Sequence, residues 1–452
     1  MSNQIEMSNR EITINLNDDR YNCLYSGVKS EHLKYIEIKR VVFNIKEYFI
    51  LKYKKPFILD KFHHNPLSVL PHDKYTFDID IDEGMFRSVI ASNGKILSYS
   101  PSKSYGFELF KNMYNQTEKK EQKMEDLCVE EFIEGTMINV FYEDYDQLYD
   151  EQKGKKSKWI INTKSNIGAH NVYFTDGKID KSQDTFEKMF LDACANNDFE
   201  LNDFNKKYNY TFVLQHPRNN IVCKILYPRL YLIDVYSIEN NCVTILNKTE
   251  HLNSLLNKHI SLNVKIPRRE NLVVDNLDNF DENYYYNKWH NLDNNIVMGV
   301  MIKHKNYSYR TTFRNPKYEY LKKLRGNQPK SEARYIELWK EDKLVDFLSY
   351  FTEYKDKFKD YKVKLLKLIY NVYNTYVSCF IHKLVKLEDV SYELKPHMYY
   401  LHNLYRNELK PNKKSMHISV VFNYFKNMPL SQIMYTMNYS YRPIQEVVEV
   451  KE

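Results

Sequence analysis

The spacing of apolar residues changes at Pro316, and this change constrains the fold more than any other feature of the chain. Before it, from about residue 73 to about residue 310, short alternating or continuous apolar runs predict β-strands. These runs cover residues 88–99, 136–142, 159–163, 210–214, 229–237 and 296–303, and Asn93-Gly94 predicts a hairpin turn within the first. After Pro316, apolar residues recur at helical spacing, at Leu365, Leu368, Ile369, Val372 and Tyr376. We therefore predict a sheet domain followed by a helical domain.

Charged segments and prolines divide these two parts further. Residues 115–126 and 143–158 are rich in charge and interrupt the predicted strands, so we expect surface loops there. Pro396, Pro411 and Pro429 mark breaks between helical segments. The predicted fold class is α+β. The predicted regions are an N-terminal extension over 1–72 that packs on the core, a sheet domain over 73–315 and an all-α domain over 316–452.

Composition allows a large core and weakly favours a polyanionic partner. The chain has 452 residues, of which 43% are hydrophobic. Its net charge is +7 and its pI about 8.7, and attraction to phosphate depends on local more than total charge. A solvated basic surface accounts for this charge equally well. Tyrosine and lysine are abundant enough to indicate an AT-rich coding bias, so a single tyrosine or lysine carries little weight.

Cysteine spacing and hydropathy indicate a reducing compartment. The polar opening 1–20 holds no signal peptide, and no apolar stretch approaches the roughly 18 residues of a membrane span. The six cysteines form no C-x-x-C pair and have no closely spaced histidine, which argues against a zinc site. They are Cys23, Cys128, Cys194, Cys223, Cys242 and Cys379. We expect a protein that is neither secreted nor membrane-spanning.

Several common catalytic and nucleotide-binding motifs are absent. The chain has 10 glycines and contains neither G-x-G-x-x-G nor G-x-x-x-x-G-K-[ST], so phosphate-cradling loops of these two types are excluded. H-E-x-x-H and G-x-S-x-G are also missing. These absences remove the most familiar nucleotide-binding and hydrolase interpretations.

Three other patterns have both a functional and a structural interpretation. Asp78, Asp80 and Asp82 would share one face of a strand and could hold a cation, but a solvent-facing strand explains them better, so no metal site is predicted. His397 and His402 are five apart, which misses the spacing of two ligands on one helix face, so we expect structural histidines. A basic stretch interleaved with tyrosines predicts either an RNA-binding patch or a solvated face. It comprises Arg314, Lys317, Lys322, Lys323 and Arg325, followed by Lys330 and Arg334.

Residues 132–141 read Phe-Ile-Glu-Gly-Thr-Met-Ile-Asn-Val-Phe, and this segment resembles the Lys-x-Asp/Glu-Gly motif of nucleotidyltransferases with Phe132 in place of the lysine. Other segments resemble, in order, motifs of the RNA ligase family of the phage type, the ATP-dependent enzymes that join or repair RNA strands. They are residues 85–90, 100–110, 162–168, 212–222, 297–303 and 309–312. Their order is more informative than any single match. The helical remainder is similar to ligase-like proteins of large DNA viruses.

This resemblance implies a nucleotidyltransferase domain with antiparallel sheets and a set of ligand-binding residues. The nucleotide- or RNA-binding residues that it implies are Arg87, Lys103, Glu134, Lys164, Lys303 and Arg310. Glu134 occupies the position whose carboxylate binds the ribose. The departures from the family pattern fall on its catalytic positions. Phe132 stands at the position of the attacking lysine, Val213 lies near that of one glutamate, and Met298 stands at that of another. Arg310 and Thr312 replace the final pair of lysines. Phenylalanine cannot carry a nucleotidyl group as a lysine amine does, so no catalytic residue is predicted.

Three hypotheses follow from different classes of protein. The first is a catalytically inactive RNA-ligase-like protein that binds RNA, an RNA end or a nucleotide and needs no cofactor. The second is an active ATP-dependent RNA ligase that uses ATP and Mg²⁺ and takes its nucleophile from Lys103 or Lys164. The third is a viral structural or assembly protein that docks on a viral or host protein. The likeness to viral proteins implies the host cytoplasm, a viral factory or the virion as its location.

Overall fold

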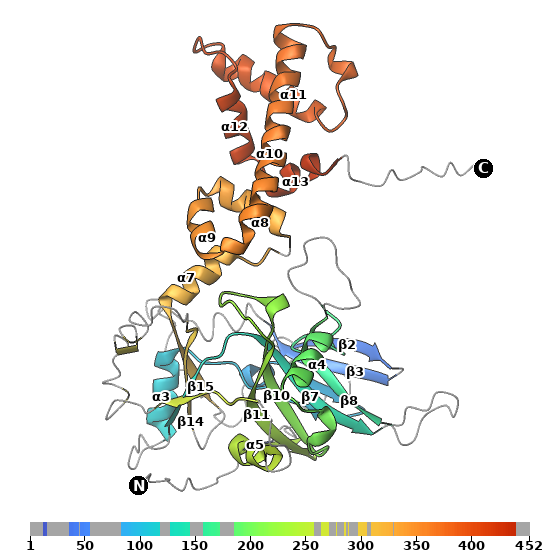
Figure 1. The fold of residues 1–452 in the computed structure, drawn as a ribbon, viewed down its shortest axis with the longest axis vertical. Coiled ribbons are helices and arrows are strands. Elements are labelled where there is room, and N and C mark those ends of the chain that lie inside the picture. Colours follow the sequence, from blue (N-terminus) through green and yellow to red (C-terminus); the bar gives the residue numbers. More distant parts are fainter. Residues whose placement is uncertain are drawn as a thin grey trace, which may run out of the picture. The chain divides into compact units, whose positions relative to one another are not determined.

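The structure is a computed structural model that describes residues 12–15, 36–44, 46–54, 83–117, 127–144, 157–171, 185–256, 264–270, 277, 284–285, 288, 297–304, 309–328 and 330–439. Two compact units divide the chain between Lys322 and Lys323, and we call them the sheet unit and the helical unit (Figure 1). The predicted α+β class, with antiparallel sheets and a helical C-terminal region, is confirmed. The predicted strand face of Asp78, Asp80 and Asp82 lies outside the described residues.

The largest sheet of the sheet unit has seven strands in the order β1-β12-β11-β10-β7-β8-β9, and every neighbouring pair is antiparallel. The strands are β1 Ile12–Asn15, β12 Cys242–Leu246, β11 Arg229–Glu239, β10 Tyr208–Gln215, β7 Thr136–Asp144, β8 Ser157–Thr163 and β9 Asn166–Ile167. Four predicted strands are therefore confirmed, each somewhat longer than predicted. The loop predicted over 143–158 was drawn too wide, because both its ends belong to the β7–β8 ladder.

Two four-stranded antiparallel sheets complete the sheet unit. One has the order β2-β3-β4-β5, with β2 Ile36–Phe43, β3 Lys46–Tyr53, β4 Val89–Ser92 and β5 Lys95–Ser98. The other has the order β13-β6-β14-β15, with β13 Arg269–Glu270, β6 Leu127–Glu131, β14 Gly299–His304 and β15 Arg310–Arg314. The predicted hairpin is β4–β5, and its turn residues Asn93 and Gly94 have φ of 49° and 71°, as a type I′ turn requires.

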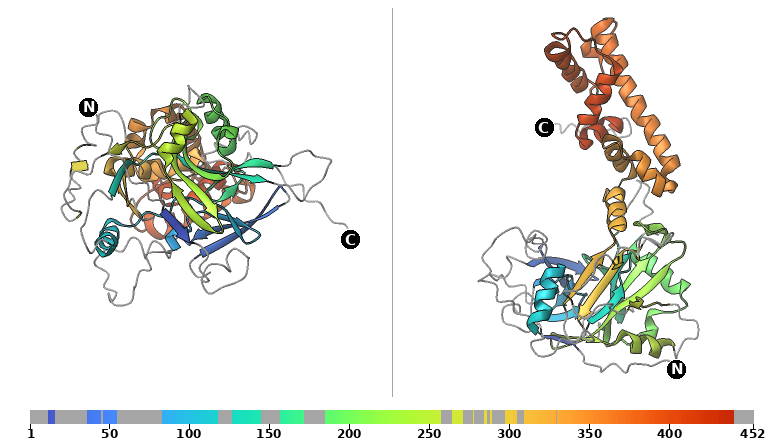
Figure 2. Two further views of the ribbon diagram at one scale, coloured as in Figure 1. Left: turned by 90° about the horizontal axis from the view of Figure 1, so that it is seen from below. Right: turned by 90° about the vertical axis from the view of Figure 1, so that its left-hand side faces the viewer.

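The seven-stranded sheet is packed on both faces. Helices α4 Phe186–Asn196 and α5 Lys248–Leu256 bury one face, where the rings of Phe190 and Phe212 lie 5.5 Å apart. The other face packs on the β2–β5 sheet (Figure 2). There the ring of Tyr99 meets that of Tyr236 edge to face, with centroids 5.2 Å apart. Helix α3 Phe107–Thr117 covers the third sheet, with Phe107 4.7 Å from Phe313. The loop predicted over 115–126 therefore begins too early, since its first residues extend α3.

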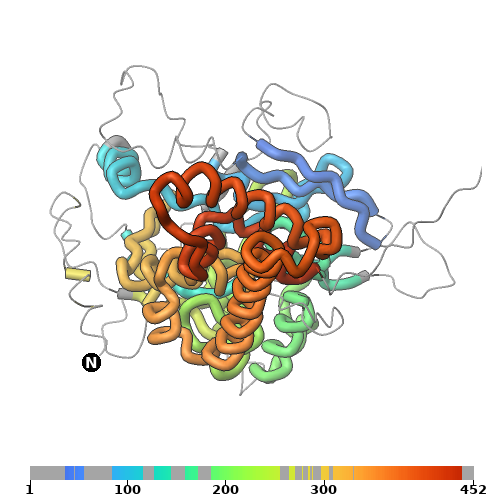
Figure 3. Tube along the Cα trace, turned by 90° about the horizontal axis from the view of Figure 1, so that it is seen from above, coloured from blue at the N-terminus to red at the C-terminus, as the bar shows by residue number. Residues whose placement is uncertain are grey.

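The helical unit is built around α10 Lys355–Tyr376, which a π-helical turn, Val377–Ile381, extends. The predicted apolar face of α10 is buried at all five positions and is confirmed. Helices that pack on α10 include α8 Ser331–Lys340, α11 Lys395–Leu404, α12 Ile418–Asn427 and α13 Leu430–Met437. Figure 3 shows these helices in orange to red. Helix α9 Leu344–Tyr350 packs on α8. The predicted proline breaks fall near the starts of α11 and α13 and after the π-helical turn Tyr405–Leu409.

The two histidines of α11 serve structure, as predicted. His397 is buried, and its ring nitrogens lie 2.8 Å from the Tyr424 hydroxyl and 3.0 Å from the Thr436 hydroxyl. Burial lowers its pKa to about 4, so the ring is neutral at pH 7. His402 stacks on Phe380 with ring centroids 4.1 Å apart. Helix α7 Pro316–Arg325 begins at the predicted domain boundary and crosses the division between the two units.

Candidate anion-binding site

Arg310 is the buried first residue of β15, and it joins that strand to the segment before α3. Its Nη2 donates a hydrogen bond to the Ser102 carbonyl oxygen, and its own carbonyl oxygen accepts one from Tyr105 N at 2.8 Å. Its Nε is buried and has no hydrogen-bond partner among the described residues. The guanidinium therefore keeps donor capacity inside the sheet unit, where an unpaired donor is costly.

Lys103 and Arg87 lie next to Arg310. Lys103 is half-buried, and its backbone N donates to the Gly84 carbonyl oxygen at 2.8 Å, which brings the two segments together. Burial, then Arg87, Arg314 and Arg310, lower the pKa of Lys103 to about 8. Burial and then Arg310 lower the pKa of Arg87 to about 10. We call Arg87, Lys103, Arg310 and Arg314 the cationic cluster.

Arg314 places the cluster beside the position where the resemblance expects a nucleophile. Its guanidinium carbon lies 5.6 Å from the centre of the Phe132 ring, and its Nη1 lies 2.8 Å from Glu319 Oε1. The Arg314–Glu319 pair is exposed, so water screens much of its attraction. Phe132 is half-buried, and its backbone N donates to the Gly299 carbonyl oxygen at 3.0 Å.

Lys164 reaches the cluster through Tyr53, a residue that the sequence did not single out. Lys164 lies in the turn between β8 and β9, and its Nζ is 3.3 Å from the Tyr53 hydroxyl and 4.6 Å from the ring centre. Tyr53 is buried, and burial raises its pKa against the opposing effect of Arg87 and Arg310. In a chain with 40 tyrosines, nothing local marked Tyr53.

Lys303 belongs to a neighbouring ion-pair network. Its Nζ lies 2.9 Å from Glu130 Oε2 and 3.3 Å from Asp234 Oδ1. Lys248, on α5, places its Nζ 2.7 Å from Glu130 Oε1, and both side chains are buried. Burial opposes the charge on Lys303, but Asp234 and Glu130 outweigh it and raise its pKa. Lys303 is thus paired with two carboxylates, whereas no such pair is described for Arg87, Lys103 or Arg310 among the residues that the structure describes.

Glu134 is held inside the fold by backbone and side-chain donors. Its carboxylate accepts hydrogen bonds from Val222 N at 3.2 Å, from Cys223 N at 3.1 Å and from the Tyr318 hydroxyl. Burial raises its pKa even though these hydrogen bonds oppose the shift. The carboxylate thereby ties the segment before β7 to the 220–223 loop and to α7. In this arrangement the implied ribose contact would compete with these hydrogen bonds.

Two glycines fix the register of the segments that carry Phe132 and Met298. Gly135 has φ of +151°, and a Cβ added there would lie 2.4 Å from the Leu214 carbonyl oxygen. Gly299 has φ of +146°, and its Cβ would lie 2.0 Å from the Phe313 carbonyl oxygen. Both positions need glycine because a neighbouring strand passes too close for any side chain.

The residues around the cluster do not fit a bound divalent metal. Val213 and Met298 stand near the positions where the resemblance expects glutamates, and Mg²⁺ prefers carboxylate oxygens. Glu134, Asp234 and Glu319 are engaged by the donors and cations described above. Across the described ranges, no group of three His, Cys, Asp or Glu side chains is arranged to hold a metal ion.

The predicted basic patch does not form one exposed surface. Lys317 and Lys323 are exposed and Lys322 is half-buried, whereas Arg325 is buried with its guanidinium 5.2 Å from the Tyr354 ring centre. Arg334, further along the stretch, is also buried and donates to the carbonyl oxygens of residues 323 and 324. The prediction of a solvent-facing stretch is wrong for these two arginines, because Arg325 packs on Tyr354 and Arg334 hydrogen-bonds to the end of α7.

Comparison with known proteins finds similarity only at the level of solved structures. No protein-family model matches the sequence, and no curated protein matches it. The Naegleria gruberi RNA ligase with PPi is similar at 13% identity and a TM-score of 0.32, over 50% of this chain and 58% of that one. An apo variant of the same ligase is similar at 12% identity and a TM-score of 0.33, over 71% and 88% of the two chains. At these values no residue's role follows from the likeness.

A variant of the same ligase with ATP and Mn is similar at 13% identity and a TM-score of 0.33, over 69% of this chain and 85% of that one. In the part of the chain that the structure describes, no helix combines the length and apolar character needed to cross a bilayer.

Proposed function

We propose that the sheet unit is a catalytically inactive, RNA-ligase-like module that binds the phosphates of a nucleotide or an RNA end at the cationic cluster. The observation that carries this proposal is the crowding of Arg87, Lys103, Arg310 and Arg314. Among the described residues, the one ion pair of these four is the exposed contact between Arg314 and Glu319. A half-buried group of like charges is stabilised by an anion that it can share.

Phosphate fits this group chemically. Guanidinium groups present paired N–H donors that match the oxygens of a phosphate, and Lys103 adds a point charge. Phe132 leaves no amine at the position expected for the nucleophile, so binding at this position would not proceed to a covalent lysine adduct there. The ring of Phe132 under Arg314 instead offers an apolar surface on which a base or sugar could rest.

Anion affinity tests the proposal directly. Isothermal titration with ATP and with a 5′-phosphorylated RNA should give affinities that Arg87→Gln weakens by about tenfold or more. Arg268→Gln is the matched control, because Arg268 is exposed and lies on the same unit. If the two variants bind as tightly as the unchanged protein, the cationic cluster is not the anion site.

A second candidate function is an active ligase that uses Lys103. The lowered pKa of Lys103 makes its amine available near neutral pH, whereas Lys164 donates to Tyr53. In this reaction Lys103 Nζ attacks the α-phosphorus of ATP, a P–N bond forms, the P–O bond to pyrophosphate breaks, and the nitrogen loses a proton.

Labelling separates the two candidates. The protein is incubated with [α-³²P]ATP or GTP and Mg²⁺ or Mn²⁺, then run on a denaturing gel. The inactive module predicts no labelled protein, with label gained in Phe132→Lys. Label on the unchanged chain that is lost in Lys103→Arg would establish the ligase instead.

A further inference from the structure

The positive charge of the chain is concentrated in the helical unit. Residues 323–439 contain 20 Lys and Arg against 12 Asp and Glu, a difference of +8, whereas residues 1–322 contain 44 of each. The net charge of +7 therefore comes from the helices and not from the sheet unit that carries the cationic cluster. A concentrated positive field attracts polyanions more strongly than the same charge spread over the whole chain.

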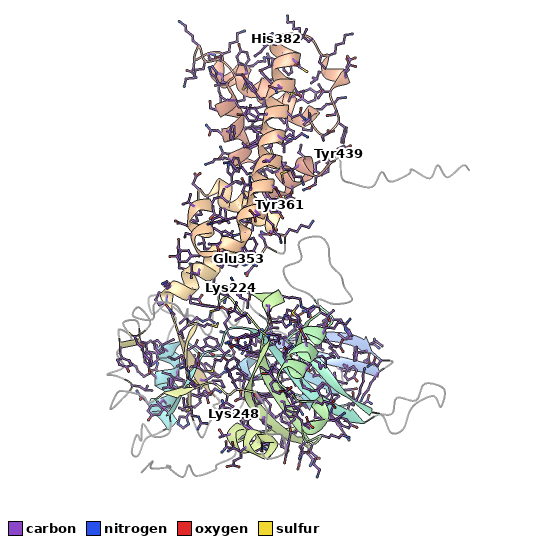
Figure 4. The ribbon with its side chains drawn as sticks, in the orientation of Figure 1. Lys224, Lys248, Glu353, Tyr361, His382 and Tyr439 are labelled. Carbon is purple, nitrogen blue, oxygen red and sulfur yellow. The ribbon has the colours of Figure 1, made fainter. Side chains whose placement is uncertain are left out.

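Part of this charge lies on two neighbouring turns at one end of the helical unit. Both α10 and α11 end in π-helical turns, where His382 N donates to Val377 O at 2.9 Å and Lys410 N donates to Tyr405 O at 2.8 Å. The stack of Phe380 on His402, at 4.1 Å and 12°, holds these helix ends side by side. Figure 4 places His382 at this end and Glu353 at the other.

We define residues 381–386 and 410–414 as the basic tip. It presents five lysines, Lys383, Lys386, Lys410, Lys413 and Lys414, all exposed. None of the five has an ion pair among the residues that the structure describes. Acidic residues are also present along 381–414, at Glu388, Asp389, Glu393 and Glu408, so the segment's seven Lys and Arg exceed its acids by three.

Exposed tyrosines stand on α11 and just before it. Tyr392, Tyr399 and Tyr400 are 71%, 62% and 54% exposed, and Tyr400 stacks on Tyr424 with centroids 4.6 Å apart. A tyrosine ring with an open face can stack on any unpaired base, because every base has a π-face. Lysines for the backbone and aromatic faces for the bases are the two components of single-strand binding surfaces.

We propose that the basic tip and the adjacent tyrosines of α11 bind single-stranded nucleic acid through its phosphodiester backbone and its unstacked bases. This surface is separate from the cationic cluster of the sheet unit and does not depend on the function proposed for it. An acidic protein fits less well. Protein interfaces are depleted in lysine at their cores and favour arginine, whereas all five cations of the tip are lysines.

Salt-dependent binding of an unphosphorylated single-stranded RNA of about 20 nucleotides to the full chain tests this proposal. The test variant combines Lys410→Gln, Lys413→Gln and Lys414→Gln. We expect an affinity about tenfold lower at low salt and a slope of log K against log salt reduced by up to about two, since each lost single-strand phosphate contact contributes about 0.7. Tyr399→Leu should weaken binding about tenfold and leave that slope unchanged.

The matched control removes three exposed lysines from the first half of α10, through Lys355→Gln, Lys359→Gln and Lys362→Gln. Thermal melts verify that each variant is folded. The proposal is overturned if the tip and control variants lose equal affinity, or if poly-glutamate displaces the RNA as well as unlabelled RNA does, which would indicate an acidic protein partner. Single-stranded DNA as competitor distinguishes RNA from any single strand. Arg87→Gln should leave this binding intact.

Discussion

Lys103 changes its charge close to neutral pH because burial and three neighbouring arginines lower its pKa to about 8. Its amine is charged below that pH and neutral above it, so the cationic cluster loses one charge as the pH rises. We predict that affinity for inorganic sulfate, used as a probe that mimics a terminal phosphate, falls several-fold between about pH 7 and about pH 9. Sulfate is a suitable probe because its charge is constant over this range. Fluorescence competition or calorimetry measures the change.

Substitution with arginine isolates this effect. Lys103→Arg keeps a cation that does not titrate, so its affinity should stay level across the same pH range. Lys207→Arg is the control, because Lys207 is exposed in the turn before β10 and the variant should retain the pH step of the unchanged protein. A pH step that persists in Lys103→Arg would assign the titration to another group.

Sequence reasoning located the cationic cluster but not its surroundings. Arg87, Lys103 and Arg310 lie in short segments that resemble, in order, the motifs of the RNA ligase family. In the structure the three side chains lie near one another. Tyr53 and the Glu130–Lys248 pair were missed, because their partners lie far away in the chain and each residue type is common. The neutralisation of Lys303 was missed for the same reason, since Asp234 and Glu130 sit on other strands.

Among the elements, short sequence patterns predicted the turns and helix faces that form between residues close together in the chain. The β4–β5 hairpin follows from two residues that tolerate positive φ, and the buried face of α10 follows from helical spacing. The arrangement of three sheets does not follow from such signals, because β1 pairs with β12 across more than half of the sheet unit's sequence. The boundaries of the charged loops were misplaced because α3, β7 and β8 extend past their outermost apolar residues. Backbone hydrogen bonds of the β7–β8 ladder and of the helix continue through polar or charged residues there.

Glu130 ties four elements of the sheet unit together. From β6 it pairs with Lys303 on β14, with Lys248 on α5 and, at 3.6 Å, with Arg269 on β13. Burial opposes its charge, but Lys303 and Lys248 outweigh burial and lower its pKa. We predict that Glu130→Gln lowers the free energy of unfolding by about 3 kcal/mol or more, since buried cations then lose their partner. Denaturant titration measures this difference.

The neighbouring Glu131 supplies the control for this prediction. It pairs with Arg268 at 3.1 Å, but the Arg268 side chain is 82% exposed, so Glu131→Gln should cost less than about 1 kcal/mol. Because the folded pKa of Glu130 is lowered, its stabilisation is present above the unfolded value near about 4.3 and is lost as the pH falls below it. Equal losses for the two variants would contradict a buried network that links the elements.

At the scale of the whole molecule, the excess of positive charge and the buried cations belong to different units. The sheet unit has no net charge in its sequence but contains the cationic cluster, in which Arg87, Lys103 and Arg310 are partly or fully buried. The helical unit instead carries an excess of exposed lysines. A small anion therefore binds at the cationic cluster, among partly buried donors. A long polyanion binds at the exposed basic tip. Binding to the first should depend weakly on salt, and binding to the second steeply.

This division predicts a crossed pattern of effects. With ATP as ligand, Arg87→Gln should lower affinity and the triple tip variant should not; with an RNA that lacks a 5′-phosphate, the effects should be reversed. With a 5′-phosphorylated RNA, titration should resolve two sites, and each variant should weaken binding at its own site only. Calorimetry on Arg87→Gln, on the triple tip variant and on their combination gives the affinities for all three ligands. If either variant weakens both ligands equally, the chain has one anion site rather than two, and the charge of the helical unit acts only as a general field.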